Sequence, residues 1–145
     1  MKVKDVLKIY MDMYDDFDLE CCLTILKRFQ IDAKQRIKTM SKGTKEKFQL
    51  GMVMSRHAKL IVLDEPIGGV DPAAREVILD MILNHYQEDQ TLIIATHLIA
   101  DIERIFDSVL FLKDGKIIVN GNVEELRERS GKSMDELFKE TFRYE

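Results

Sequence analysis

The sequence has no long apolar run and no apolar segment at its start. Its longest uninterrupted apolar runs, which include 60–63 and 92–95, are four residues long, whereas a helix needs about 20 apolar residues to cross a bilayer. The first eight residues carry charge throughout and lack the apolar stretch of a secretory signal. No membrane span is therefore expected, and the cytosol is the expected compartment.

Cysteine, proline and glycine are also scarce. The two cysteines, Cys21 and Cys22, are adjacent and have no histidine nearby, so they can form neither a disulfide framework nor a zinc site. With 7 Gly, 2 Pro, 46% apolar residues and a net charge of −4, the chain of 145 residues is neither disordered nor of low complexity. These values are typical of one ordinary globular domain with a buried core.

Charge is distributed unevenly along the chain. Residues 1–57 hold 12 basic and 8 acidic side chains, whereas residues 58–145 hold 10 and 18. The segment 27–47 is the most basic, and its positive field favours phosphate, although a solvated helical face has the same composition. Because aromatic residues do not alternate with the basic ones, Phe29 being the single aromatic in this segment, and the overall balance is acidic, we expect no nucleic-acid partner.

Two amphipathic helices are predicted at the start of the chain. Apolar residues repeat with helical spacing over 3–14 and again over 19–26. An acidic cluster between Asp12 and Glu20 separates them, but it lacks the glycine and the glutamate that a calcium-binding EF-hand loop needs at its sixth and twelfth positions. We therefore interpret these acids as helix caps and solvated carboxylates.

From residue 60 the pattern changes to that of an α/β fold. The segments 60–63 and 91–95 are short, continuously apolar runs, typical of parallel strands buried on both faces and joined by a crossover helix. Asp71 as N-cap and Pro72 at the first helical position mark the start of that helix. The apolar stripe of the helix is Val77, Ile78, Met81 and Ile82.

The rest of the chain predicts a helix, a hairpin and two short helices. The helix follows His97 and carries apolar residues on one side as far as Phe106. Strands over 108–113 and 116–120 flank Asp114-Gly115, which is a strong hairpin turn signal. The tail from residue 123 reads as two helices broken at Gly131.

The strongest chemical signal is the acid pair Asp64-Glu65, directly after the first predicted strand. Ligands of open α/β sheets bind at the carboxyl ends of the strands. One carboxylate there can hold Mg²⁺, and a second one can polarise water. His97 follows the second strand and is expected at the same edge, whereas His57 and His85 have no such placement.

A further signal lies at the start of a predicted helix near residue 41. Ser41 is a natural N-cap, and the exposed amides of a helix N-terminus bind anions, especially where Gly43 lets a phosphate approach the backbone. Alone, this segment is also typical of an ordinary capped helix.

In their order and spacing, these segments resemble the C-terminal portion of the ATP-binding cassette (ABC) ATPases, the motor subunits of ABC transporters. Residues 40–44 resemble the signature motif, 60–64 the Walker B strand and 68–71 the D-loop. The run Asp-Glu-Pro-x-Gly-Gly-x-Asp-Pro-x-x-Arg, which ends at Arg75, is highly specific and is similar to exporter-type cassettes. The resemblance covers residues 35–122 and is loose before them.

The resemblance implies a role for each candidate residue. Asp64 would hold Mg²⁺, Glu65 would be the catalytic base, and His97, as the switch histidine, would contact the γ-phosphate of ATP. The residues implied in nucleotide binding are Ser41, Lys42, Gly43 and Asp71. In the family two ATP molecules lie between paired subunits, each held by the phosphate loop of one and the signature of the other.

The sequence also departs from the family pattern. Lys42 stands where the signature usually has glycine, and Thr44 stands where it has glutamine; Lys42 could add charge toward a γ-phosphate or point to solvent. The phosphate loop Gly-x-x-x-x-Gly-Lys-Ser/Thr is absent, and the Q-loop glutamine is not identifiable. The tripeptide at 131–133 follows a predicted helix rather than a strand, so it does not replace that loop.

The resemblance thus implies a partial P-loop NTPase of the ABC ATPase type. We expect a helical subdomain over 1–57 that ends in the signature helix, the C-terminal part of the parallel-sheet core over 58–122, and C-terminal helices over 123–145. The expected architecture is a cassette that lacks its first strands and phosphate loop, either in the gene or through truncation.

The function implied is that of the ATP-binding and ATP-hydrolysing subunit of an ABC transporter, with the chain alone inactive. Its partners would be a membrane permease and a second ATPase subunit, at the cytoplasmic face of the membrane. Two alternatives stay open: a soluble ABC-type ATPase without a permease, and a non-enzymatic remnant that pairs with an intact subunit. An unpaired apolar sheet edge also favours a dimer or larger assembly.

Overall fold

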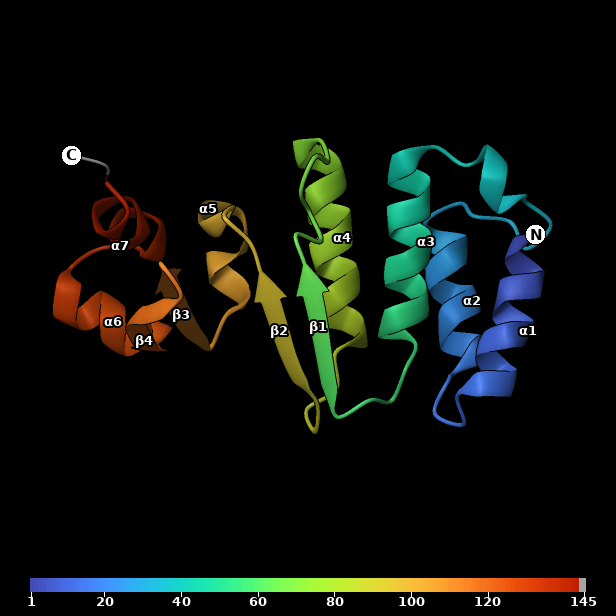
Figure 1. Ribbon diagram of the computed structural model, residues 1–145, viewed down its shortest axis with the longest axis horizontal. Coiled ribbons are helices and arrows are strands. Elements are labelled where there is room, and N and C mark those ends of the chain that lie inside the picture. The colour runs from blue at the N-terminus through green and yellow to red at the C-terminus, as the bar shows by residue number, and fades with distance from the viewer. Residues whose placement is uncertain (144–145) are drawn as a thin grey trace. The chain divides into compact units, whose positions relative to one another are not determined.

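The computed structural model describes residues 1–143, which form two compact units, Met1–Thr96 (unit 1) and the residues from His97 onward (unit 2) (Figure 1). The elements of unit 1 are α1 (Val3–Met13), α2 (Leu19–Arg28), the 3₁₀ helix η1 (Ile37–Thr39), α3 (Lys42–Met54), β1 (Leu60–Asp64), α4 (Pro72–His85) and β2 (Thr91–Ala95). Those of unit 2 are α5 (Ile99–Ile102), the 3₁₀ helix η2 (Glu103–Ile105), β3 (Ser108–Lys113), β4 (Lys116–Asn122), α6 (Val123–Ser130) and α7 (Met134–Thr141).

Helices α1 to α3 form the first part of unit 1, and their periodic apolar residues build its core. The N-terminus of α2 is capped by Asp18, whose carboxylate accepts a hydrogen bond from the Cys21 backbone N–H at 2.8 Å. The buried residues of this core are Val3, Leu7, Cys22, Leu26, Ile31, Met40, Phe48 and Met52. The two opening helices predicted from the sequence are therefore confirmed.

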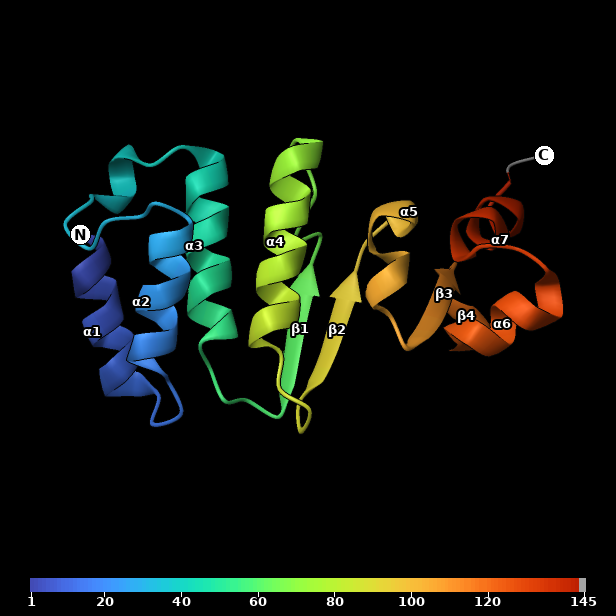
Figure 2. The ribbon, with the colours of Figure 1, turned by 180° about the vertical axis from the view of Figure 1, so that it is seen from behind.

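Strands β1 and β2 pair in parallel, and α4 is the crossover helix between them. The register runs from Leu60 opposite Thr91 to Asp64 opposite Ala95. Figures 1 and 2 show α4 on one face of this pair. The α4 helix begins as the sequence predicts, because Asp71 accepts a hydrogen bond from the Ala74 N–H at 3.1 Å and proline follows at the first helical position.

The prediction that these strands are buried on both faces is wrong. In β1, Ile61 and Leu63 are buried, whereas the side chains between them alternate to the other face, and Leu60 and Val62 are 53% and 59% exposed. Within the described residues α4 covers a single face of the sheet, so alternate side chains are buried in β1 and half-buried in β2, and those between them are exposed.

The crossover helix α4 also differs in detail from its predicted apolar stripe. Leu79 is fully buried, but Val77 is exposed. The buried stripe of α4 therefore includes Leu79 in place of Val77, whereas Ile78, Met81 and Ile82 are buried as predicted.

Unit 2 is built around the predicted hairpin. Asp114 and Gly115 form its turn with positive φ angles of 51° and 74°, as such a two-residue connection requires. Gly131 ends α6 in the left-handed conformation, which confirms the predicted break between the last helices. The buried core of unit 2 is Ile99, Val109, Phe111, Val123 and Met134. Residues 144 and 145 of the predicted tail lie outside the described residues.

The helix predicted from His97 to Phe106 is shorter than expected. It consists of the single α-helical turn α5 followed by the 3₁₀ turn η2. Phe106 is already extended, with φ −97° and ψ 134°, because β3 begins two residues later. No helix among residues 1–143 is both long enough and apolar enough to cross a bilayer.

Candidate functional site

The candidate site residues of unit 1 gather at one end of that unit. The carboxyl ends of β1 and β2 and the N-terminal ends of α3 and α4 all lie at the upper end of unit 1 in Figures 1 and 2. The sequence places Ser41 to Gly43 at the start of α3, Asp64 and Glu65 at the end of β1, and Asp71 at the start of α4. Topology therefore brings three segments that are distant in sequence to the same end.

The start of α3 is a capped helix N-terminus that is open to solvent. The Ser41 hydroxyl accepts a hydrogen bond from the Thr44 backbone N–H at 3.2 Å and pairs with the Thr44 hydroxyl at 2.8 Å. A Cβ added to Gly43 would have nothing within 4 Å. The Lys42 side chain is 92% exposed and lies 3.8 Å from the Glu46 carboxylate. This end can therefore offer backbone amides to an anion.

The backbone at Glu65 is held in an unusual conformation. Glu65 has φ +47°, a left-handed value that a non-glycine residue adopts only at a cost of roughly 1–2 kcal/mol. Two hydrogen bonds fix it there: its N–H donates to the Ala95 carbonyl at 2.8 Å, and its carbonyl accepts from the Gly68 N–H at 2.9 Å. The chain thus turns sharply away from β1 immediately after Asp64.

The Glu65 side chain is contacted by Thr96, which was not among the predicted site residues. The Thr96 hydroxyl donates a hydrogen bond to Glu65 Oε2 at 2.9 Å. The sequence contained a signal for this contact. Thr96 directly follows β2 just as Glu65 directly follows β1, and the parallel pairing of the two strands places these residues side by side. The carboxyl ends of β1 and β2 are thus joined by a hydrogen bond between side chains as well as by backbone pairing.

The turn after Glu65 depends on two glycines. A Cβ on Gly68 would lie 3.2 Å from both the Cβ and the carbonyl oxygen of Glu65, so a larger residue would press on the glutamate. Gly69 has φ +69°, which favours glycine for conformational reasons. Ile67, which directly precedes the two glycines, is fully buried and so anchors the turn in the core.

Asp64 lies at the end of β1 with an exposed carboxylate. By strand alternation it shares the open face of the sheet with Leu60 and Val62. Among residues 1–143 no group of three or more histidine, cysteine or acidic side chains could hold a metal. One exposed carboxylate still fits Mg²⁺, which keeps several waters and takes one or two carboxylates together with substrate phosphates.

His97 is the first residue of unit 2, and it follows Thr96 directly. The predicted position of its imidazole beside the acid pair stays a prediction. No site role was predicted for His57 or His85. His57 Nε2 lies 3.5 Å from the carboxylate of Asp18, which precedes α2, and His85 Nδ1 lies 2.8 Å from the Met81 carbonyl oxygen one turn earlier in α4.

The acidic cluster after α1 has structural roles. Asp16 forms a two-pronged ion pair with Arg56 at 2.6 and 3.0 Å, and the guanidinium lowers the pKa of the Asp16 carboxyl below its ordinary value. The Cys21 backbone N–H, which Asp18 caps, lowers the pKa of Asp18 in the same direction. The interpretation as caps and surface carboxylates rather than a calcium site is therefore supported, with an ion pair in addition.

The adjacent cysteines lie on α2 as free thiols. Cys22 is buried, and burial raises the pKa of its thiol to about 11. Its Sγ lies 3.6 Å from the Met52 sulfur in the helical core. Both thiols therefore stay largely protonated near neutral pH, because burial raises the pKa of Cys21 as well.

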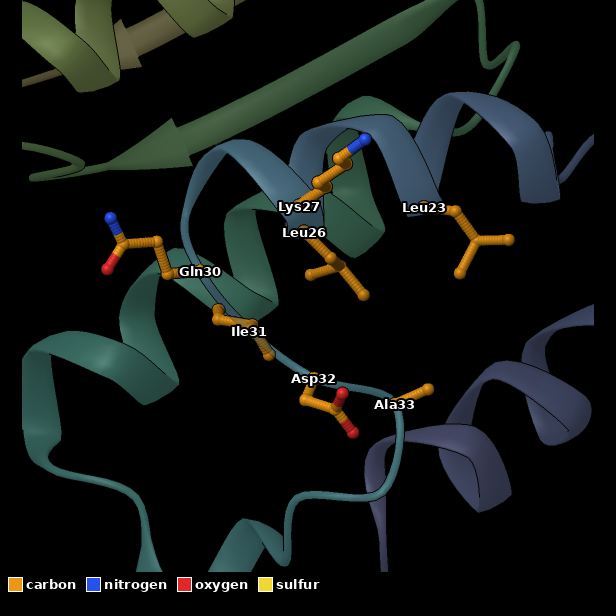
Figure 3. Close-up of a pocket in the computed structure, with 7 residues that line it drawn as sticks. All are labelled: Leu23, Leu26, Lys27, Gln30, Ile31, Asp32 and Ala33. Carbon is orange, nitrogen blue, oxygen red and sulfur yellow. The ribbon is translucent and has the colours of Figure 1, made fainter.

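A cavity of about 380 Å³ lies beside the C-terminal end of α2. Figure 3 shows its lining side chains on α2 and on the segment that follows it; they are Leu23, Leu26, Lys27, Gln30, Ile31, Asp32 and Ala33. None of these is a candidate site residue. The basic segment 27–47 borders this cavity and is partly used in surface contacts, since Arg28 lies 3.7 Å from Asp80 and Lys47 lies over the Phe29 ring.

Comparison with known proteins gives relatives along most of the chain. The sequence is 32% identical over 130 residues to the uncharacterized ABC transporter ATP-binding protein MJ1023 of Methanocaldococcus jannaschii, which covers 86% of this chain and 50% of that protein. It is 28% identical over 126 residues to the ABC transporter ATP-binding protein YtrB of Bacillus subtilis, covering 86% and 43%. No protein-family profile matches the chain.

Solved structures give the same result for the fold. The ATP-binding subunit of an ABC transporter superposes with a TM-score of 0.85 at 23% identity, over 99% of this chain and 63% of that one. The predicted family resemblance and the mixed α/β, partial P-loop NTPase fold are thereby confirmed. The chain spans about half or less of the length of these curated relatives, and the roles of the individual site residues stay predictions.

Proposed function

We propose that this chain, which is related over most of its length to the ATP-binding proteins of ABC transporters, is part of an ATPase that powers such a transporter. It would be the part that carries the signature motif and the acid pair. The observation that carries the proposal is the acid pair at the carboxyl end of β1, with Glu65 held by hydrogen bonds from its backbone and its side chain. A carboxylate fixed at that position suits a general base.

The proposed reaction is hydrolysis of ATP by in-line attack of water. The water oxygen bonds to the γ-phosphorus, the bond from that phosphorus to the oxygen bridging it to the β-phosphate breaks, and ADP leaves with the bridging oxygen. Glu65 accepts a proton from the attacking water. His97 contacts the γ-phosphate, where charge develops in the transition state.

The start of α3 would act on a nucleotide held by a second subunit. Ser41 and Gly43 present the N-terminal amides of α3, whose positive dipole end favours phosphate. The exposed ammonium of Lys42 lies on the same turn, and it can either exchange its contact with Glu46 for a phosphate or stay in solvent. Asp71, at the start of α4, contributes to the same nucleotide-facing end.

Mg²⁺ is the metal that this donor set suits. Asp64 would hold it through its exposed carboxylate, often through water, with phosphate oxygens and water completing its ligands. When bound, the ion neutralises charge on the transferred phosphoryl group. This assignment depends on Asp64 alone among the residues of this chain.

The partners proposed are a membrane permease and a second ATPase subunit, either identical or related. The permease would be a separate polypeptide, and the ATPase would lie at the cytoplasmic face of the membrane against it. Within the family, the run that ends at Arg75 is similar to exporter-type cassettes, so we propose the exporter type. Because the chain contains no phosphate loop, the 145 residues alone are expected not to hydrolyse ATP.

A second candidate function follows from the missing phosphate loop. A chain with the signature but without that loop could pair with an intact ATPase subunit without hydrolysing ATP at its own site. Both candidate functions assume that the 145-residue chain alone cannot hold the phosphates of ATP. Calorimetric titration of the chain with Mg-ATP tests this assumption, and we expect no binding at millimolar or lower ATP concentrations. Micromolar binding would show that residues other than a phosphate loop hold the phosphates, and the segment 27–47 would be examined first.

The base assignment is tested in the complete ATPase, meaning a polypeptide or complex that contains this region and a phosphate loop. Glu65→Gln should retain ATP binding and lower turnover at least about 100-fold, because the amide cannot accept the proton. The matched control is Glu88→Gln, an exposed residue between α4 and β2, which should leave turnover unchanged. Near-normal hydrolysis by Glu65→Gln would refute the assignment.

A further inference from the structure

The hydrogen bond between Thr96 and Glu65 continues the pairing of the two parallel strands by one residue. The β1–β2 register ends with Asp64 opposite Ala95, so Glu65 and Thr96 are the next residues on each strand. The Glu65 N–H still donates to the Ala95 carbonyl at 2.8 Å, although Glu65 has left extended geometry. The Thr96 hydroxyl then reaches Glu65 Oε2 at 2.9 Å.

The Thr96 contact restricts a side chain that has several rotatable bonds. Fixing a glutamate side chain costs up to about 2 kcal/mol of rotamer entropy, and the backbone hydrogen bonds of Glu65 do not themselves orient its carboxylate. A threonine is suited to fixing it, because its branched Cβ restricts its own χ1 rotation and so holds the hydroxyl in place. A charge-assisted hydrogen bond to a carboxylate is also stronger than one between neutral groups.

We propose that Thr96 is a positioning residue for Glu65: its hydroxyl holds the carboxylate in the orientation in which Glu65 receives a proton from water. The inference rests on the proposed function, since it assigns a second residue to the same base. Thr96 acts through Glu65 and takes no proton itself. A displacement of about 1 Å in a catalytic group can lower the rate 100-fold, so a hydrogen bond that holds the carboxylate in place can affect the rate strongly.

The competing interpretation is that this hydrogen bond only fastens the end of β2 to the end of β1. Such a role would change the stability of the strand pair but would leave the order of the Glu65 side chain and the kcat of the folded ATPase unchanged. The two interpretations are separated by variants that keep or remove the hydroxyl at nearly constant shape, namely Thr96→Ser and Thr96→Val.

The first measurement uses the 145-residue chain and requires no activity. NMR relaxation of the Glu65 side chain at constant pH measures how firmly that side chain is held, with its signals assigned by the Glu65→Gln variant. Thr96→Val removes the donor, so the order parameter of the Glu65 side chain should fall, whereas Thr96→Ser should stay close to wild type. A Thr96→Val chain in which Glu65 is as ordered as in wild type would overturn the proposal.

The second measurement uses the complete ATPase and separates this proposal from the proposed function. Thr96→Val should lower kcat roughly tenfold with little change in KM, and Thr96→Ser should restore most of it. If Glu65→Gln abolishes turnover while Thr96→Val leaves kcat unchanged, the role of Thr96 is wrong and the base stands. If Glu65→Gln retains turnover, the base assignment fails, whatever Thr96 does to the order of the Glu65 side chain. Should Thr96→Val lose its folded amide spectrum, Thr96→Ala replaces it in both measurements.

Discussion

Both faces of the β1–β2 sheet carry large apolar side chains, but their surroundings differ. Leu63, which faces α4, is 7% exposed, whereas Leu60, on the same strand and the other face, is 53% exposed. Across the pair, Ile93 of β2 lies opposite Val62 and is exposed as well. Parallel strands are normally covered on both faces, so the open face has the composition of a core without the burial of one.

The hairpin of unit 2 repeats this asymmetry within its own strands. Val109 and Phe111 of β3 are buried in the unit's core, whereas Leu110 and Leu112 between and after them are 58% and 64% exposed. In both units, therefore, alternate residues of an apolar strand stay in contact with solvent. An apolar run in the sequence indicates which residues can be buried, but not how many faces a neighbouring element covers.

The largest effect expected from the two faces of β1 is on stability. Leu63→Ala should lower the free energy of unfolding by about 2 to 4 kcal/mol, because it leaves a cavity under α4. Leu60→Ala, the matched substitution on the open face, should cost less than about 1 kcal/mol. Urea unfolding of the two variants, followed by circular dichroism, measures the difference.

Equal losses of unfolding free energy in the two leucine variants would contradict the proposed difference between the two faces. They would mean that Leu60 is buried in solution by something other than the residues of its own unit. Repeating the unfolding at several protein concentrations then identifies the cause, because burial by a second copy makes the midpoint depend on concentration, whereas burial within one chain does not.

A smaller effect is expected on self-association. The open face and the unpaired strand edges favour a dimer or larger assembly in solution. Val62→Lys places a charge in the middle of that face, at a position 59% exposed within the chain, and should raise the dissociation constant at least about tenfold. Light scattering across a dilution series of each protein gives the dissociation constants of the wild type and of Val62→Lys.

The control for Val62→Lys is Leu83→Lys, an exposed apolar residue of α4, which should leave the association unchanged. A wild-type chain that is monomeric at every concentration would refute the association itself. Association that survives Val62→Lys unchanged would instead place the contact elsewhere than the open face.

Much of this arrangement could be predicted from local chemistry. The Asp71-Pro72 start of α4, the Asp114-Gly115 turn and the break at Gly131 depend on caps and backbone angles that a few neighbouring residues determine, and all three are confirmed. The parallel pairing of β1 and β2 also followed from two apolar runs with a helix between them.

The features that the sequence did not predict depend on contacts between distant residues. The prediction that β1 is buried on both faces was wrong, because the number of elements that cover a sheet is not encoded in the strand itself. The Asp16–Arg56 ion pair could not be predicted either, since it joins residues 40 positions apart. Thr96 was missed for the same reason, since its partner Glu65 lies 31 positions earlier in the chain. A rule that looks for polar residues following each of two paired strands would have found it.

The smallest expected effect separates an exposed acid at the end of a strand from an acid that caps a helix. Asp64 and Asp71 lie at the same end of unit 1, but Asp64 is exposed on the open face, whereas Asp71 caps α4 through the Ala74 N–H. Asp71→Ala should therefore cost about 1 kcal/mol of unfolding free energy, and Asp64→Ala less than about 0.5 kcal/mol. A loss from Asp64→Ala as large as that from Asp71→Ala would show that its carboxylate stabilises the strand end. A negligible loss, together with impaired Mg²⁺-dependent turnover in the complete ATPase, is what a metal ligand on an uncovered face requires.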